Sequence, residues 1–148
     1  MCGIFALLGH HKHNNDEEKT KLIMNSFNKG KKRGPETSTW IDSFEYNFSF
    51  GFHRLAINGL DPNSDQPINF ENIKLICNGE IFNYQELYNE LNINPKTNSD
   101  CEVIIHLYKN YGIEQTLQML DGEFSFILFD SDKQVMYVCR DPYGIRPL

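Results

Sequence analysis

Strands are predicted wherever short apolar segments recur along the chain. Residues 4–9 form an apolar run without polar alternation, which is typical of a strand buried on both faces. Residues 46–52 alternate between aromatic positions and polar or small ones, which predicts a half-buried strand. Three more strands are expected over residues 73–77, 123–129 and 134–139, and the nearly continuous apolar run in the second of these indicates a sheet covered on both sides.

Four helices are predicted from apolar residues that repeat every three or four positions. The first spans residues 17–33 and ends at Gly34-Pro35. Two more begin at capping boxes, in which paired side chains satisfy free N–H groups of the first turn; these are Asn83 with Glu86, and Ser99 with Glu102. The fourth is shorter and carries its apolar positions between Ile113 and Leu120.

The number and order of these elements limit the architecture. With 148 residues and a mass of 17.3 kDa, the chain has room for one domain. Strands at both ends with helices between them predict a layered sandwich of helices and sheets, and the sequence contains neither an internal repeat nor a linker.

Composition excludes several classes of function. The formal net charge is −6 and no basic block is longer than residues 29–33, so a nucleic-acid-binding protein, which needs a basic face, is excluded. No window reaches 18 consecutive apolar residues, and the first residues lack the pattern of a secretory signal. We therefore expect a cytoplasmic protein with no nucleic-acid or membrane partner.

The cysteines and histidines do not form a metal framework. The cysteine spacing contains no CxxC pair and fits no zinc site, so we expect free thiols in a reducing compartment at Cys2, Cys77, Cys101 and Cys139. A weak metal site could involve three nearby histidines, His10, His11 and His13, but a solvated loop is the simpler interpretation of that segment.

Cys2 is the first candidate for chemistry. Removal of Met1 would leave a cysteine with a free α-amine, whose unperturbed pKa of roughly 7.7–8.0 makes it a usable base near neutral pH. A thiol beside its own amine is a nucleophile–base pair that needs no separate His or Asp. The strand that follows Gly3 would hold this terminus in place, while an incidental cysteine is the structural alternative.

Three more positions could bind a substrate of acyl transfer, a reaction that needs donors for a developing oxyanion. Asn78-Gly79 follows a predicted strand and offers a side-chain amide and an unobstructed backbone N–H. Asp100 lies in the first turn of a predicted helix, and Arg54 follows a strand. Each has a structural alternative when taken alone: a plain turn, a helix cap and a surface arginine, respectively.

A set of ordered motifs resembles the class II glutamine amidotransferases, which are N-terminal nucleophile hydrolases. The motifs are Met-Cys-Gly-Ile-Phe at 1–5, Arg-Gly-Pro at 33–35, His-Arg-Leu-Ala-Ile at 53–57, Gln66-Pro67, Asn-Gly-Glu-Ile-Phe-Asn at 78–83, Ser-Asp-Cys-Glu-Val-Ile at 99–104 and Arg-Asp-Pro-Tyr-Gly-Ile-Arg-Pro-Leu at 140–148. Within this class, the segments at 78–83 and 99–104 resemble the glutaminase domain of glutamine-dependent asparagine synthetases. The resemblance extends over essentially the whole chain.

The resemblance implies an α+β fold, a four-layer αββα sandwich of antiparallel sheets, with residues 2–148 forming a glutaminase domain. In the family this domain typically continues for several more elements, and a synthetase domain follows it. The chain is therefore expected to be truncated at its C-terminal end, with a homodimer as a possible assembly.

The resemblance also implies a role for each candidate residue. Cys2 would attack the side-chain amide carbon of glutamine, and its α-amine would pass the proton to the departing ammonia. Water would then hydrolyse the glutamyl thioester to glutamate. Asn78 and the Gly79 N–H would hold the oxyanion. Substrate binding would involve Arg54 at the α-carboxylate, Glu80 and Asp100 at the α-ammonium, and the backbone of Ile57 and Asn58 along the pocket wall.

No metal or cofactor is expected in this chain, whereas ATP and Mg²⁺ would act in the synthetase domain, where ammonia meets an aspartyl-adenylate. Three positions depart from the usual family pattern, namely Lys32 in place of a histidine, Glu36 in place of an aspartate and Asn58 in place of an aliphatic residue. Two alternatives stay open: another class II amidotransferase with a different acceptor, and a non-catalytic relative that only binds an amino acid or a partner chain. The joint presence of the thiol, arginine, amide and carboxylate favours an enzyme.

Overall fold

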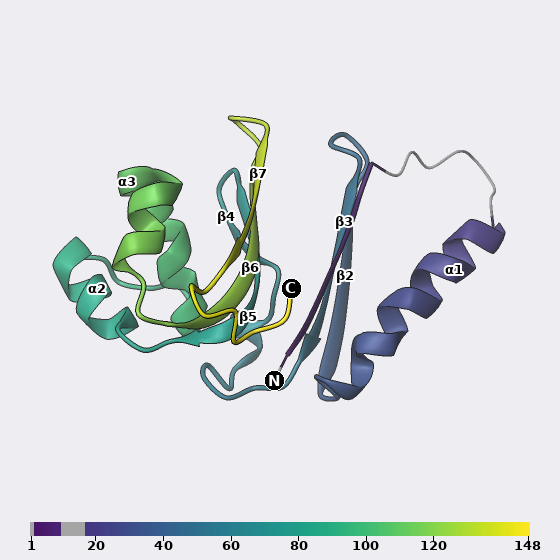
Figure 1. Cartoon of the computed structure of the whole chain (residues 1–148), viewed down its shortest axis with the longest axis horizontal. Helices are drawn as coiled ribbons and strands as arrows, with labels where there is room; N and C mark the ends of the chain where they lie inside the picture. Colours follow the sequence, from purple (N-terminus) through teal and green to yellow (C-terminus); the bar gives the residue numbers. More distant parts are fainter. Residues whose placement is uncertain (1, 10–16) are drawn as a thin grey trace.

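The computed structural model describes residues 2–9 and 17–148, which form four layers with two sheets at the centre (Figure 1). The first sheet has the order β1-β3-β2 and consists of β1 (Gly3–Leu8), β2 (Thr37–Ser43) and β3 (Phe48–Arg54). The second follows chain order and consists of β4 (Ile68–Phe70), β5 (Ile73–Ile81), β6 (Gly122–Asp130) and β7 (Val135–Arg140). Every strand pairing is antiparallel.

Helices cover the two outer faces (Figure 1). The first sheet carries α1 (Glu17–Asn28), which a 3₁₀ turn continues over Lys29–Lys32. The second sheet carries α2 (Tyr84–Leu91) and α3 (Val103–Met119), the latter preceded by the 3₁₀ turn Asp100–Glu102. The αββα sandwich implied by the family resemblance is therefore confirmed. In the described part of the chain, no helix has the length and apolar character needed to cross a membrane.

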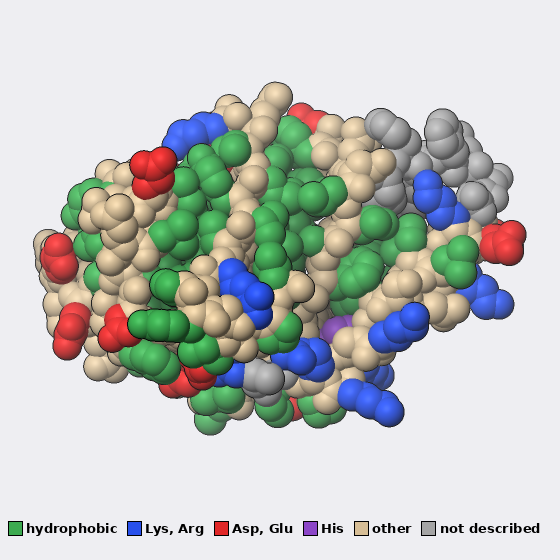
Figure 2. All heavy atoms as spheres, viewed as in Figure 1, with side chains coloured by type: hydrophobic (Ala, Val, Ile, Leu, Met, Phe, Trp, Pro, Cys, Tyr) green, Lys and Arg blue, Asp and Glu red, His purple; other side chains and the backbone are tan. Residues whose placement is uncertain are grey.

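The two sheets pack through an aromatic core. Phe48 and Phe50 of β3 lie against Ile76 of β5 and against Ile127 and Phe129 of β6, and none of these side chains is more than 7% exposed. Burying each one stabilises the fold by about 1.5–3 kcal/mol relative to leaving it in water. In the space-filling view, hydrophobic side chains follow the seam between the sheets, and Lys and Arg side chains gather around α1 (Figure 2).

The second face of β3 is buried as well. Gly51 pairs with Phe5 on one side and Trp40 on the other, and the Phe27 ring of α1 covers this row. A Cβ at position 51 would lie 2.5 Å from the Phe27 ring, so only glycine fits there. All seven residues of β3 are buried, and the prediction of a half-buried strand is wrong because Phe27 of α1, rather than solvent, covers the face that contains Gly51 and His53.

Several strand predictions also need correction. β1 lies at an edge of its sheet, so most of its residues are half-buried rather than covered on both faces. β5 continues to Ile81, and Asn78-Gly79 therefore lies inside the strand, paired with Ser125 and Phe124, rather than after it.

The sequence pattern did not predict β2 or β4. β2 lacks a clean alternation of apolar and polar residues, and β4 has only three residues. The expected burial of β6 on both faces is confirmed.

The helix predictions are confirmed in part. The predicted first helix is α-helical only as far as Asn28 and ends as the 3₁₀ turn. The last two predicted helices are joined as α3 across a kink at Gly112, where φ is 77°. The first capping box is wrong, because the Asn83 side chain donates to Met119 O and accepts from the Asp121 N–H instead. The histidine cluster His10, His11 and His13 lies outside the described residues.

The second capping box forms only half of the predicted pattern. The Ser99 hydroxyl accepts from the Cys101 N–H, as a cap should. The fully buried Glu102 carboxylate does not bond back to Ser99; it accepts from the Lys96 and Thr97 N–H groups at 2.8 and 2.7 Å. His106 Nε2 lies 3.0 Å from the same carboxylate. Burial alone would raise the pKa of Glu102, but these hydrogen bonds lower it to about 2. Glu102 thus anchors the loop that leads into Asp100.

Replacement of Glu102 by Gln is expected to reduce the free energy of unfolding by about 1–3 kcal/mol, because a buried amide cannot accept from both loop N–H groups and one donor loses its partner. Chemical denaturation at neutral pH measures this loss. In the wild type, the contribution of the ionised carboxylate is present above its unfolded pKa and disappears as the pH falls towards 2. An unchanged denaturation midpoint for Glu102→Gln would contradict the anchoring role.

Candidate active site

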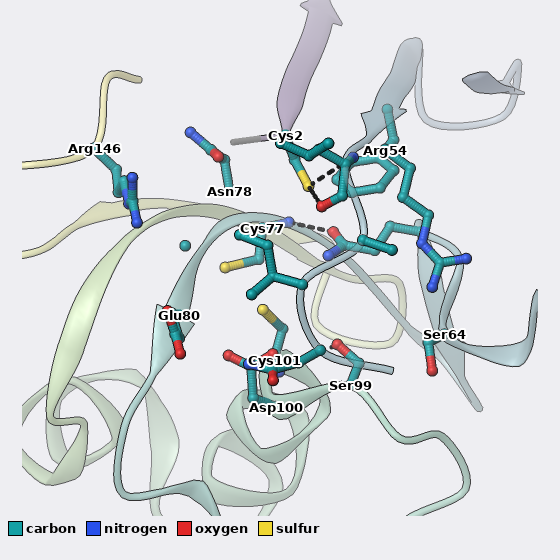
Figure 3. A pocket seen from close by; sticks show the side chains of 17 residues that line it. Cys2, Arg54, Ser64, Cys77, Asn78, Glu80, Ser99, Asp100, Cys101 and Arg146 are labelled. Carbon is teal, nitrogen blue, oxygen red and sulfur yellow. Dashed lines mark hydrogen bonds between the residues drawn. The ribbon is translucent and has the colours of Figure 1, made fainter. Parts of the chain in front are cut away.

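A single pocket brings together every residue that the sequence singles out as a site residue (Figure 3). The pocket lies where the end of β3, the second half of β5 and the 3₁₀ turn before α3 meet. Its lining includes Cys2, Arg54, Ile57, Asn58, Asn78, Gly79, Glu80 and Asp100. These residues come from four separate parts of the sequence, so the convergence is a property of the fold.

Cys2 is fixed by the strand that follows it. Gly3 pairs with His53, which places the Cys2 thiol beside the residue after β3. Cys2 Sγ lies 3.3 Å from Leu55 O and 3.4 Å from Leu55 N, so the thiol can both donate to and accept from this backbone. Burial raises the pKa of the Cys2 thiol, and the hydrogen bond with Leu55 opposes this shift in part. The thiol is therefore held in its protonated form and needs a base before it can attack.

Arg33 is a further supporting residue to which the sequence analysis assigned no role. Its Nε donates to Cys2 O at 3.0 Å, which ties the turn after α1 to the residue that carries the thiol. The approach depends on Gly34, because a Cβ there would lie 2.2 Å from His53 O. The Arg-Gly-Pro motif at 33–35 marks this arginine in the sequence. The motif alone could not predict the contact, because Arg33 and Cys2 are 31 residues apart in the chain.

The outer edge of β5 forms one wall of the pocket. β4 pairs only with the first three residues of β5, so the N–H groups further along this edge need other partners. The Cys77 N–H donates to Gln66 Oε1 at 2.5 Å, and the Ile81 N–H donates to Asp100 Oδ2 at 2.7 Å. Because N–H groups of alternate residues point to the same edge, the Gly79 N–H lies between these two and is directed towards the pocket.

Position 79 accepts only glycine. A Cβ there would lie 2.4 Å from Glu123 O and 2.6 Å from Phe124 Cα, both backbone atoms that cannot move aside cheaply. Asn78, one residue earlier, is 2% exposed and lines the same pocket as Cys2 (Figure 3). A side-chain amide and a backbone N–H from adjacent residues therefore line the same pocket as the thiol. Because Asn78-Gly79 lies within β5, the structural alternative of a plain turn is wrong.

Arg54 reaches the opposite side of the pocket. Its guanidinium group forms an ion pair with Asp65 at 2.5 Å and donates to Gly59 O and Asp61 O. The group points away from Cys2 (Figure 3) and is 7% exposed as a residue, so it is not a surface arginine. It fastens the loop after β3, the same loop in which Ile57 and Asn58 line the pocket.

Asp100 and Glu80 give the pocket a negative side. Burial raises the pKa of the Asp100 carboxyl, hydrogen bonds from Ile81 and Asn58 lower it in part, and the charge of Glu80 raises it again. Two acidic groups held together in a sheltered pocket favour a cationic group on the ligand. The Asp100 carboxylate is thus more than a helix cap.

Glutamine, the substrate that the family resemblance implies, carries an α-ammonium group. Its affinity is expected to fall as the pH decreases, starting at a higher pH than an ordinary aspartate would give. The reason is that Asp100 gains its proton earlier and loses its attraction for the ammonium. The pH dependence of KM for glutamine measures this. Asp100→Asn should raise KM by roughly 10- to 100-fold at neutral pH and remove this part of the profile. A KM profile that the substitution leaves unchanged would exclude Asp100 from binding.

Nine more residues line the pocket without having been predicted as site residues, among them Gln66, Cys77, Cys101 and Arg146. The hydrogen bond with Cys77 and complete burial raise the pKa of the Cys101 thiol well above its usual value. Thiols in such a setting are poor nucleophiles. Cys77 and Cys101 are both buried, whereas Cys2 is half-buried and can carry its own α-amine as a base once Met1 is removed. Cys2 is therefore the thiol in this pocket that is suited to attack, and all four cysteines are free.

Comparison with known proteins identifies the family of this chain. A family model described as a glutamine amidotransferase domain matches residues 1–148. The chain belongs to this family. Similar proteins include three asparagine synthetases (glutamine-hydrolyzing). Those of Mesocricetus auratus and Gallus gallus are 40% identical to this chain, over 153 and 154 residues respectively, and that of Homo sapiens is 39% identical over 153 residues. Each match covers 100% of this chain but 26% of the relative, so this amidotransferase domain spans about a quarter of their length.

Proposed function

We propose that this amidotransferase domain hydrolyses the side-chain amide of glutamine to glutamate and ammonia, with Cys2 as the nucleophile. The observation that carries the proposal is the position of Cys2 Sγ in one pocket with the Asn78 amide and the Gly79 N–H. A nucleophile that shares a pocket with two hydrogen-bond donors is the arrangement that acyl transfer requires. Family membership supports the same reaction class.

The reaction begins after removal of Met1. The α-amine of Cys2 takes the thiol proton, Sγ attacks the amide carbon of glutamine, and the amine returns the proton to the departing ammonia. The Asn78 amide and the Gly79 N–H hold the oxyanion, and each such donor is worth roughly 3–4 kcal/mol in the transition state. Water then attacks the glutamyl thioester with the same amine as base, which releases glutamate and restores the thiol.

Substrate binding uses the two sides of the pocket. Glu80 and Asp100 receive the α-ammonium group, and backbone groups of Ile57 and Asn58 line the path of the side chain. Arg54 binds the α-carboxylate, which requires its guanidinium to share or exchange the contact with Asp65. This pairing of charges orients glutamine so that its amide reaches Cys2.

In the whole protein, we propose that the ammonia serves the ATP-dependent conversion of aspartate to asparagine in a synthetase domain. The similar proteins are glutamine-hydrolyzing asparagine synthetases and are about four times as long as this chain, which supports the proposal. ATP and Mg²⁺ would bind in that domain rather than in the pocket described above. Free thiols at all four cysteines support a cytoplasmic location.

Incubation of the chain with L-glutamine, with glutamate and ammonia measured in parallel, tests the proposed hydrolysis. Equal amounts of both products are expected, and their absence in a folded protein with Met1 removed would instead support a non-catalytic, amino-acid-binding relative. Intact mass spectrometry verifies the removal of Met1. Addition of ATP, Mg²⁺ and aspartate to the longer protein that carries a synthetase domain distinguishes asparagine synthesis from an amidotransferase with a different acceptor.

A further inference from the structure

The segment after β7 delivers a second arginine to the pocket through a tightly bonded turn. Three backbone N–H groups donate to the buried Asp141 carboxylate at 3.0–3.2 Å, namely those of Tyr143, Ile145 and Arg146. The Arg140 guanidinium donates to Arg146 O and to Gly144 O. The Ser125 hydroxyl of β6 donates to Pro147 O at 2.8 Å, which fastens the turn to the sheet. The position of Arg146 is therefore fixed by the fold.

Arg146 faces a pair of carboxylates that lie directly across two strands. In the register of β5 and β6, Glu80 is opposite Glu123, and directly opposed residues share one face of the sheet. Like charges in this position repel each other. Arg146 Nη2 lies 2.5 Å from Glu123 Oε1, with the two side chains 13% and 26% exposed, so the guanidinium neutralises one member of the pair.

We infer that Arg146 is a positioning residue for the substrate ammonium group: by neutralising Glu123, it leaves Glu80 directed into the pocket and available to that group. The inference rests on the proposed glutaminase function and adds to it a residue that acts on substrate binding through Glu80. Figure 3 shows Arg146 on the side of the pocket opposite Arg54, beside Asn78 and above Glu80. Without the guanidinium, repulsion from Glu123 would turn the Glu80 carboxylate away from its binding position.

The test compares L-glutamine with 4-carbamoylbutanoate, which keeps the carboxylate and the amide but lacks the ammonium group. Arg146→Met should raise KM for glutamine by about three- to tenfold and leave kcat within about twofold, because repulsion between opposed carboxylates affects binding rather than chemistry. The inhibition constant of 4-carbamoylbutanoate should stay unchanged. Arg146→Lys, which keeps the positive charge, should retain most of the affinity.

The double variant Arg146→Met with Glu123→Gln is the matched control, since it removes the cation and the carboxylate that it neutralises. Its KM for glutamine should return to within about twofold of the wild-type value. Equal weakening of both ligands by Arg146→Met would mean that Arg146 binds the carboxylate directly, and a KM that the second substitution does not restore would mean a merely structural role. Either result overturns the inference while glutamine hydrolysis by the wild type still stands. A wild type that neither hydrolyses nor binds glutamine would overturn both.

Discussion

Cys2→Ala should reduce the rate of glutamine hydrolysis by about 10⁶-fold, because without the thiol no thioester forms and the remaining groups cannot replace that step. The Cys2 side chain forms its hydrogen bonds with the Leu55 backbone and holds no distant element in place, so the fold should be retained. The variant should still bind glutamine, since the proposed charge contacts of the substrate lie elsewhere in the pocket. Product assays and calorimetric titration with glutamine measure the two effects separately.

Cys139→Ala is a matched control for this substitution. Cys139 lies on β7, away from the pocket lining, and it is a free thiol of intermediate burial. Burial raises its pKa to about 11, which makes it a poor nucleophile at neutral pH. Its loss should leave turnover unchanged. Residual turnover in Cys2→Ala above one thousandth of the wild-type rate would point to a different nucleophile.

Asn78→Ala should lower kcat by roughly 10²- to 10³-fold with little change in KM for glutamine. The side-chain amide strengthens its hydrogen bond only as the carbonyl oxygen gains charge, so its loss affects the transition state more than the bound substrate. Cys2 should still be alkylated by an electrophile that resembles glutamine, because the thiol remains in place. Steady-state kinetics and an alkylation rate on the same sample measure these outcomes.

Thermal unfolding of Asn78→Ala separates this role from a structural one. Asn78 lies inside β5, paired with Ser125, and its backbone pairing survives the substitution. A normal melting temperature with lost turnover supports the oxyanion role. If turnover is normal, whatever the melting temperature, the Asn78 amide does not take part in catalysis.

Periodicity predicted the elements whose environment is uniform. β6, which is apolar at nearly every position, is buried on both faces as expected. Periodicity was wrong where a neighbouring layer changed the environment. Gly51 of β3 lies on the face that the alternation assigned to solvent, yet Phe27 of α1 covers it, and whether a helix packs there is not encoded within β3.

The capping predictions failed for a related reason. Asn83 has the sequence context of a helix cap, but its amide bonds to Met119 O and the Asp121 N–H, which the fold brings within reach. Glu102 bonds to loop N–H groups rather than to its own helix start. A polar side chain can form a hydrogen bond with a neighbour in the sequence or with a distant residue, and the packing of the fold decides between the two. The spacing of residues along the chain does not contain this information.

The sequence by itself determined the candidate residues, because their types carry the chemistry: a thiol at position 2, an Asn-Gly pair, an arginine and an acidic residue in motifs of fixed order. Only the tertiary structure decided how they meet. It placed the Gly79 N–H between the bonded N–H groups of Cys77 and Ile81, directed Arg54 towards Asp65, and brought Arg146 to Glu123. Strand register and loop closure set these contacts, and both depend on packing between residues far apart in the chain.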